Sequence, residues 1–146
     1  DPARKVKNYG LFAEACRELE KRGCQVEEVH LVNVERKKVP EVYWSSDIML
    51  LTSFSEGSPT VIKEAIAAKL PFVSVDVGDA KEWVKSIEFG AVAADRNPKT
   101  IANEAVSLLS RIRNRSSLDN SKCLDAIDLT SIARRIRRMY GEVLEQ

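Results

Sequence analysis

The residues best suited to bind a ligand lie in one short stretch, where Glu56 and Glu64 enclose the sequence Gly-Ser-Pro-Thr-Val-Ile-Lys. The apolar run Ile-Met-Leu-Leu at 48–51 precedes it, so the stretch reads as a strand, a loop and a helix. We expect Ser58 at the helix N-cap and Pro59 at the first helical position, where its missing N–H costs nothing. The free N–H groups of the first turn and the positive end of the helix dipole would then seat a phosphate group. The candidate backbone contacts are Gly57, Ser58, Thr60 and Val61.

The two glutamates suit hydroxyl groups better than phosphate. Glu64 is expected roughly 9 Å along the helix axis from Ser58, at ~1.5 Å per residue, and a carboxylate would repel a phosphate. Each carboxylate can accept two hydroxyl protons side by side. A ligand that carries hydroxyl groups on both sides of its phosphates matches a nucleotide-diphosphate sugar. Taken without its surroundings, the same pair would be a solvated loop acid and an exposed helix residue.

The sequence around these acids resembles the donor-binding half of the group 1 retaining glycosyltransferases. The resemblance runs from Ser-Ser-Asp-Ile-Met-Leu-Leu-Thr-Ser at 45–53, through two glutamates separated by seven residues, to Leu-Pro-Phe-Val-Ser-Val-Asp-Val-Gly-Asp at 70–79. It covers about residues 7–90, with a weaker match near 129–144. Enzymes of this kind have the B-type architecture of two Rossmann-like domains. The resemblance implies a hexosyltransferase that retains anomeric configuration and acts in polysaccharide or glycolipid biosynthesis.

The resemblance also implies roles for the acids. Glu56 would contact hydroxyls of the transferred sugar and is the catalytic candidate, and Glu64 would bind the ribose diol. Many relatives carry an aromatic residue and a glycine after the first Glu-Gly, whereas this chain has Ser58 and Pro59. The donor therefore cannot be named from the motif.

Basic residues complete the candidate donor site. The family uses a lysine and an arginine to neutralise the departing diphosphate, and Lys7 matches the lysine. Pro2 stands at the usual place of the arginine, so either Arg4 replaces it or the arginine lies elsewhere. Arg36 falls in the loop where the family places the nucleotide base, and it is a candidate base or ribose contact.

Composition excludes several classes of protein. A net charge of +1 with 31% charged residues indicates no nucleic-acid partner. The three cysteines show no metal-ligand spacing and fit reduced thiols in a cytoplasmic protein. No apolar run approaches the ~20 residues of a membrane span. Asp76 and Asp79 form no tight pair and His30 lies in an expected strand, so we expect no metal and no cofactor besides the donor substrate.

Apolar strands alternate with amphipathic helices, which predicts an α/β fold: a Rossmann-like, doubly wound parallel sheet flanked by helices. At 146 residues the chain is expected to form a single domain, residues 1–146. Expected strands cover Val29 to Val34, Ile48 to Thr52, Phe72 to Val75 and Ala91 to Ala93. Expected helices cover Asn8 to Arg22, a short stretch after Pro40 with Tyr43 and Trp44 as packing residues, Pro59 to Ala68, Asp79 or Ala80 to Lys85, and Pro98 to Ser110.

The two ends of the chain carry further expectations. A doubly wound sheet normally opens on a strand, whereas this chain opens on a helix, so we expect a strand ahead of Asp1. The resemblance adds a missing N-terminal acceptor domain, to which the last helix, about 129–145, would cross. The present chain alone would then transfer no sugar. Arg134, Arg135, Arg137 and Arg138 flank an apolar stripe in that helix, and they form either a solvated face or a peripheral membrane contact.

Three functional classes remain open from the sequence. The favoured class is the donor-binding domain of a metal-independent retaining glycosyltransferase. The second is a nucleotide-sugar epimerase-type enzyme of the same fold, against which the Glu-Gly-Ser-Pro segment argues. The third is a non-enzymatic flavodoxin-like regulatory domain, which would need an acidic pocket at strand ends, whereas Asp47 precedes its strand.

Overall fold

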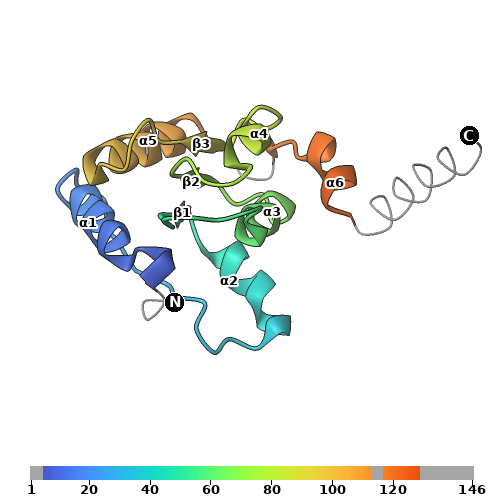
Figure 1. Cartoon of the computed structure of the whole chain (residues 1–146), viewed down its shortest axis with the longest axis horizontal. Helices are drawn as coiled ribbons and strands as arrows, with labels where there is room; N and C mark the ends of the chain where they lie inside the picture. Colours follow the sequence, from blue (N-terminus) through green and yellow to red (C-terminus); the bar gives the residue numbers. More distant parts are fainter. Residues whose placement is uncertain (1–4, 113–116, 129–146) are drawn as a thin grey trace, which may run out of the picture.

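The computed structural model describes residues 5–112 and 117–128, and it confirms the α/β class expected from the sequence. In this part of the chain, short strands alternate with helices (Figure 1). The strands are β1 (Met49–Leu51), β2 (Phe72–Ser74) and β3 (Gly90–Val92). The helices are α1 (Tyr9–Glu20), α2 (Val39–Ser45), α3 (Thr60–Ala67), α4 (Ala80–Val84), α5 (Pro98–Arg111) and α6 (Ser121–Ile127). The 3-10 turns η1 (Lys5–Lys7) and η2 (Arg36–Lys38) precede α1 and α2.

The strands form one parallel sheet in the order β1-β2-β3. Met49 of β1 pairs with Phe72 of β2, which pairs with Gly90 of β3. A helix lies in each connection between strands, because parallel neighbours need a crossover. Helix α5 packs on β2, β3 and α1, while α3 and α2 lie on the other side of the sheet (Figure 1). The carboxyl ends of all three strands therefore lie along one edge.

The burial of the central strand β2 explains why this strand could be predicted from the sequence. Phe72 and Val73 are at most 1% exposed. A strand covered on both faces reads as a continuous apolar run, and Pro-Phe-Val-Ser-Val at 71–75 is such a run. The helices close the core from both sides with Ile62 and Ile66 of α3 and Ile101 and Leu108 of α5, all buried.

Two helix predictions are confirmed, and residues at the helix ends explain where α1 stops and α5 starts. Helix α1 falls within the expected range, and Gly23 follows it with φ 81° in a left-handed turn that glycine adopts readily. Helix α5 begins at Pro98, and the side chain of Asn97 caps it by accepting a hydrogen bond from the Lys99 N–H. Local sequence signals at these ends agree with the tertiary packing.

The expected strand from Val29 to Val34 is wrong. These residues form neither helix nor strand, and Val29 and Val32 are 53% and 40% exposed. A strand is stable only when its backbone groups bond to a neighbour, and the described part of the chain places no strand beside this segment. The segment has the apolar pattern of a strand, but the described residues offer no neighbouring strand for it to pair with.

The other predictions for individual segments are partly confirmed and partly wrong. Tyr43 is buried as a packing residue, whereas Trp44 is 65% exposed, so the packing role expected for it is wrong. The short helix α6 was not expected; Asn120, just before it, donates a hydrogen bond to the Ile66 carbonyl at 2.8 Å. The last helix, about 129–145, lies outside the described residues. Among the residues described, none of the helices has the length and apolar character that a bilayer crossing requires.

Candidate functional site

The candidate site lies where the loops after the three strands meet. The loop after β1 runs from Thr52 to Pro59 and leads into α3. It contacts the loop after β2 through Gly78 and Asp79, and the loop after β3 through Arg96. Ligands of open parallel sheets bind at the carboxyl ends of the strands. The expected location of the binding loop is therefore the one that the topology favours.

The start of α1 is tied to the end of β1. The Thr52 hydroxyl donates to the carbonyl oxygens of Lys7 and Asn8, at 3.2 and 3.3 Å. The Phe54 N–H donates to the Val6 carbonyl at 2.8 Å. These bonds bring together two segments about 45 residues apart in the sequence, and they hold Lys7 beside the loop.

Lys7 and Glu56 form an ion pair. The Lys7 Nζ lies 2.6 Å from the Glu56 Oε1, with side-chain exposures of 30% and 18%. Two residues predicted for the donor site are thus in direct contact. A partly buried ammonium and carboxylate in one place can bind a phosphate oxygen and a hydroxyl group at the same time.

The loop between β1 and α3 is packed against a glycine. A Cβ on Gly78 would lie 2.1 Å from the Gly57 carbonyl oxygen, and Gly78 has φ +52°. Both the close approach and the backbone conformation require a residue without a side chain. The Gly-Asp pair at 78–79 therefore packs directly against the Glu-Gly-Ser loop and supports it.

The start of α3 differs from the expectation. The helix begins at Thr60, and Pro59 occupies the N-cap position with φ −67° and ψ 114°. The Ser58 hydroxyl does not cap the helix; it donates to Asp79 Oδ2 at 2.5 Å. Proline in the extended conformation ends the loop one residue later than predicted. The first helical N–H groups are then those of Thr60 and Val61, which have no carbonyl partner within the helix.

Asp79 lies at the start expected for the helix that the structure shows as α4. It holds the N-cap position of α4, yet its side chain makes no capping hydrogen bond. Its Oδ2 accepts from Ser58, and its Oδ1 is buried without a hydrogen-bond partner among the described residues. Asp79 thus acts mainly on the loop that carries Glu56.

Glu64 is oriented by a buried tyrosine. The Tyr43 hydroxyl donates to Glu64 Oε2 at 2.8 Å, and Tyr43 is only 4% exposed. Burial, together with this bond to the carboxylate, raises the pKa of Tyr43 well above its usual range. The phenol therefore stays a hydrogen-bond donor across the physiological pH range. Helix α2 thereby fixes the carboxylate of α3.

We expect Tyr43→Phe to lower the free energy of unfolding by about 0.5–1.5 kcal/mol, because it removes a hydrogen bond inside the protein. Urea denaturation measures the change. Tyr9→Phe is the matched control, since the Tyr9 hydroxyl donates to Glu28 at an exposed position. The interpretation is contradicted if both variants lose the same stability.

Arg96 is a residue that the sequence analysis missed. Its guanidinium donates to the Ser53 and Phe54 carbonyls at 2.7 and 2.9 Å, and it lies over the Phe54 ring at 5.9 Å. It ties the loop after β3 to the loop that carries Glu56. Its place just after a predicted strand, at the ligand-binding edge, was the available signal.

The remaining residues singled out from the sequence are Arg4, Arg36 and His30. Arg4 lies outside the described residues. Arg36 is exposed in η2, and its role as a base contact stays a prediction. His30, expected in a strand that does not form, lies in a cluster with the rings of Tyr9 and Phe12. No cluster of three or more potential metal ligands occurs in the described part of the chain, and the expected independence from metal stays a prediction.

Comparison with known proteins identifies the family. A family model described as glycosyl transferases group 1 matches residues 3–111. The chain belongs to this family. The matched range includes Lys7, both glutamates and Arg96, so the loop cluster described above lies wholly within the group 1 glycosyl transferase match.

Two curated relatives are glycosyltransferases from bacteria. One, from Campylobacter jejuni, is N,N'-diacetylbacillosaminyl-diphospho-undecaprenol alpha-1,3-N-acetylgalactosaminyltransferase, 28% identical over 112 residues, or 75% of this chain and 30% of the relative. The other is TuaC of Bacillus subtilis, provisionally named as a teichuronic acid biosynthesis glycosyltransferase, 39% identical over 51 residues, or 34% of this chain and 13% of the relative. The chain thus spans less than a third of either relative.

Proposed function

We propose that this chain is the donor-binding domain of a retaining, metal-independent glycosyltransferase that uses a nucleotide-diphosphate sugar. The observation that carries the proposal is the Lys7–Glu56 pair at 2.6 Å, whose carboxylate belongs to the loop that leads into α3. The pair supports the proposal because a cation and a hydroxyl acceptor meet at this loop. Neither an epimerase-type enzyme nor a regulatory domain is favoured by a specific observation.

The diphosphate would bind at the start of α3. The N–H groups of Thr60 and Val61 and the positive helix end favour phosphate oxygens there. The Lys7 ammonium would neutralise the charge that develops on the leaving diphosphate, so the site would need no metal ion for that task. Gly57 and Ser58 would leave the backbone accessible to sugar and phosphate oxygens.

The two glutamates would recognise the groups on either side of the diphosphate. Glu56 would accept hydrogen bonds from hydroxyls of the transferred sugar, where positive charge develops on the ring. Glu64, oriented by Tyr43 through its Oε2, would use Oε1 for a ribose hydroxyl. Because its position is fixed before the ligand arrives, less conformational entropy is lost on binding.

The names of the relatives support the expected role in polysaccharide or glycolipid biosynthesis. We propose that the acceptor binds to a separate N-terminal domain, as the length of the relatives allows, and that this chain alone transfers no sugar. The proposed peripheral membrane contact concerns residues 134–138, which lie outside the described residues.

A thermal-shift screen tests the donor-binding role. A nucleoside diphosphate present at 100 times its Kd is expected to stabilise the chain by about 2.7 kcal/mol, a rise in Tm on the order of 5–10 °C. Uridine diphosphate and guanosine diphosphate are the first probes, and the corresponding nucleosides are the controls because they lack the diphosphate. If no nucleoside diphosphate raises the Tm more than its nucleoside, the proposal is wrong.

A further inference from the structure

The loop that carries Glu56 is anchored on two sides. On the side of α1, the Val6 carbonyl accepts a hydrogen bond from the Phe54 N–H at 2.8 Å. On the side of β3, the Arg96 guanidinium donates to the carbonyls of Ser53 and Phe54 at 2.7 and 2.9 Å. The position of the loop therefore depends on two contacts that come from distant parts of the sequence.

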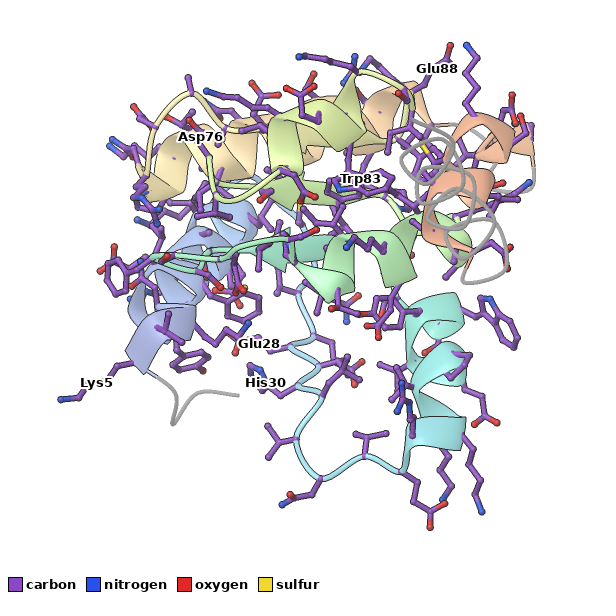
Figure 2. The ribbon with its side chains drawn as sticks, turned by 45° about the vertical axis from the view of Figure 1, so that its right-hand side comes forward. Lys5, Glu28, His30, Asp76, Trp83 and Glu88 are labelled. Carbon is purple, nitrogen blue, oxygen red and sulfur yellow. The ribbon has the colours of Figure 1, made fainter. Side chains whose placement is uncertain are left out.

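The anchor on the side of α1 belongs to the segment that supplies Lys7. The Thr52 hydroxyl donates to the Lys7 carbonyl at 3.2 Å. Figure 2 shows Lys5, just ahead of α1, and Asp76, just after β2, on the same side of the view. The start of α1 thus lies at the edge where the strands end. This anchor fixes Lys7, whereas the other side of the loop is held by Arg96.

Arg96 stabilises a bend in the loop. Carbonyl groups of successive residues point to opposite sides of an extended strand, but those of Ser53 and Phe54 accept from the same guanidinium, and the chain bends at Phe54. Two carbonyl oxygens that converge repel each other unless a donor binds both. The planar fork of an arginine suits this task, because its two terminal nitrogens present N–H groups side by side.

The backbone on either side of Arg96 is fixed. Arg96 lies in the connection between β3 and α5, where Asp95 Oδ1 accepts from the Asn97 N–H at 2.9 Å. Asn97 Oδ1 accepts in turn from the Lys99 N–H, also at 2.9 Å. The guanidinium lies 5.9 Å from the centre of the Phe54 ring. Arg96 therefore contacts the loop from a turn that is itself held in place.

Packing in the core does not explain the presence of Arg96. Its side chain is exposed, whereas Ser53, whose carbonyl it binds, is completely buried. A buried carbonyl group needs a hydrogen-bond donor. Without the guanidinium, the Ser53 carbonyl would have to find another partner, and the loop would move. Glu56 follows in the same loop and would move with it.

We propose that Arg96 is a positioning residue for Glu56. By holding the bend at Phe54, it keeps the Glu56 carboxylate beside Lys7 and aligned with the hydroxyls of the transferred sugar. The inference rests on the proposed function, because that function assigns the sugar to Glu56. Arg96 itself contacts neither the sugar nor the diphosphate. Its removal should therefore weaken binding of the sugar and leave binding of the diphosphate at the start of α3 intact.

Isothermal titration calorimetry of Arg96→Ala tests the inference. The ligands are uridine diphosphate with uridine diphosphate glucose, or guanosine diphosphate with guanosine diphosphate mannose, whichever pair raises the Tm of the wild type more. We expect Arg96→Ala to weaken binding of the nucleotide sugar about 3- to 10-fold and to change binding of the nucleoside diphosphate less than about twofold. Arg22→Ala is the matched control, since the Arg22 guanidinium also donates to a backbone carbonyl, that of Glu18, at the other end of α1.

A double-mutant cycle separates positioning from a general loss of stability. In a Glu56→Ala background the carboxylate that Arg96 positions is gone, so Arg96→Ala should change the affinity for the nucleotide sugar less than about twofold. A general loss of stability would weaken binding by the same factor in both backgrounds, and that result would overturn the inference. An effect of Arg96→Ala no larger than that of Arg22→Ala would also overturn it. If Arg96→Ala does not fold, Arg96→Lys takes its place in the same cycle.

Binding of the nucleoside diphosphate to the wild type distinguishes this inference from the proposed function. If the wild type binds the diphosphate but the cycle shows no coupling between Arg96 and Glu56, only the role of Arg96 is wrong. If the wild type binds neither the diphosphate nor the nucleotide sugar, the proposed function is wrong and the inference is overturned with it.

Discussion

Gly78→Ala is expected to destabilise the protein by roughly 2–5 kcal/mol and to abolish stabilisation by nucleoside diphosphates. About 1–2 kcal/mol comes from placing an L side chain at positive φ, and about 1–3 kcal/mol from the steric overlap. The new Cβ would lie 2.1 Å from the Gly57 carbonyl, which is backbone and cannot rotate away. The loop that carries Glu56 must therefore move. Urea denaturation measures the stability, and thermal shift measures the ligand effect.

Gly10→Ala is the matched control for that variant. Gly10 lies in α1, and a Cβ there would meet nothing within 4 Å. Alanine in a helix is expected to add about 0.5–1 kcal/mol relative to glycine. The two glycine substitutions should therefore change stability in opposite directions. A Gly78→Ala variant as stable as the wild type, with ligand binding intact, would show that the Glu-Gly-Ser loop is not positioned by Gly78.

Lys7→Ala and Glu56→Gln should change the affinity for a nucleoside diphosphate in opposite directions. Removing the ammonium is expected to weaken binding about 10- to 100-fold, the value of a charge-assisted hydrogen bond. Removing the carboxylate charge frees Lys7 from its 2.6 Å ion pair and lessens the repulsion of phosphate. Glu56→Gln is therefore expected to tighten binding about 2- to 5-fold, as expected for a partly exposed pair.

Isothermal titration calorimetry with the nucleoside diphosphate that raises the Tm measures both changes. The corresponding nucleotide sugar gives the second comparison. Glu56→Gln should weaken binding of the nucleotide sugar relative to binding of the diphosphate, because the carboxylate is proposed to accept hydrogen bonds from the sugar hydroxyls. Lys85→Ala is the control, since Lys85 pairs with Glu82 and both side chains are largely exposed. If Lys7→Ala and Lys85→Ala weaken nucleoside diphosphate binding equally, Lys7 is not the cation that binds the diphosphate.

The family and the core of the fold were accessible from local sequence. Apolar runs such as 71–75 and a proline at a helix start, as at Pro98, depend on a few neighbouring residues, so they predicted the elements correctly. The position of the two glutamates around a strand-loop-helix unit was equally local. Boundaries set by one residue were less accessible: Pro59, in the extended conformation, ends the loop, so α3 begins at Thr60.

Tertiary structure alone decided which distant residues meet. The Lys7–Glu56 pair, the Tyr43–Glu64 bond and the support of the loop by Gly78 join residues 21 to 49 positions apart, and no local pattern encodes such contacts. The same reason explains the failure at Val29 to Val34. Alternating apolar residues specify that a segment can be a strand, but pairing is a property of the neighbouring backbone, so whether the strand forms depends on what lies beside it.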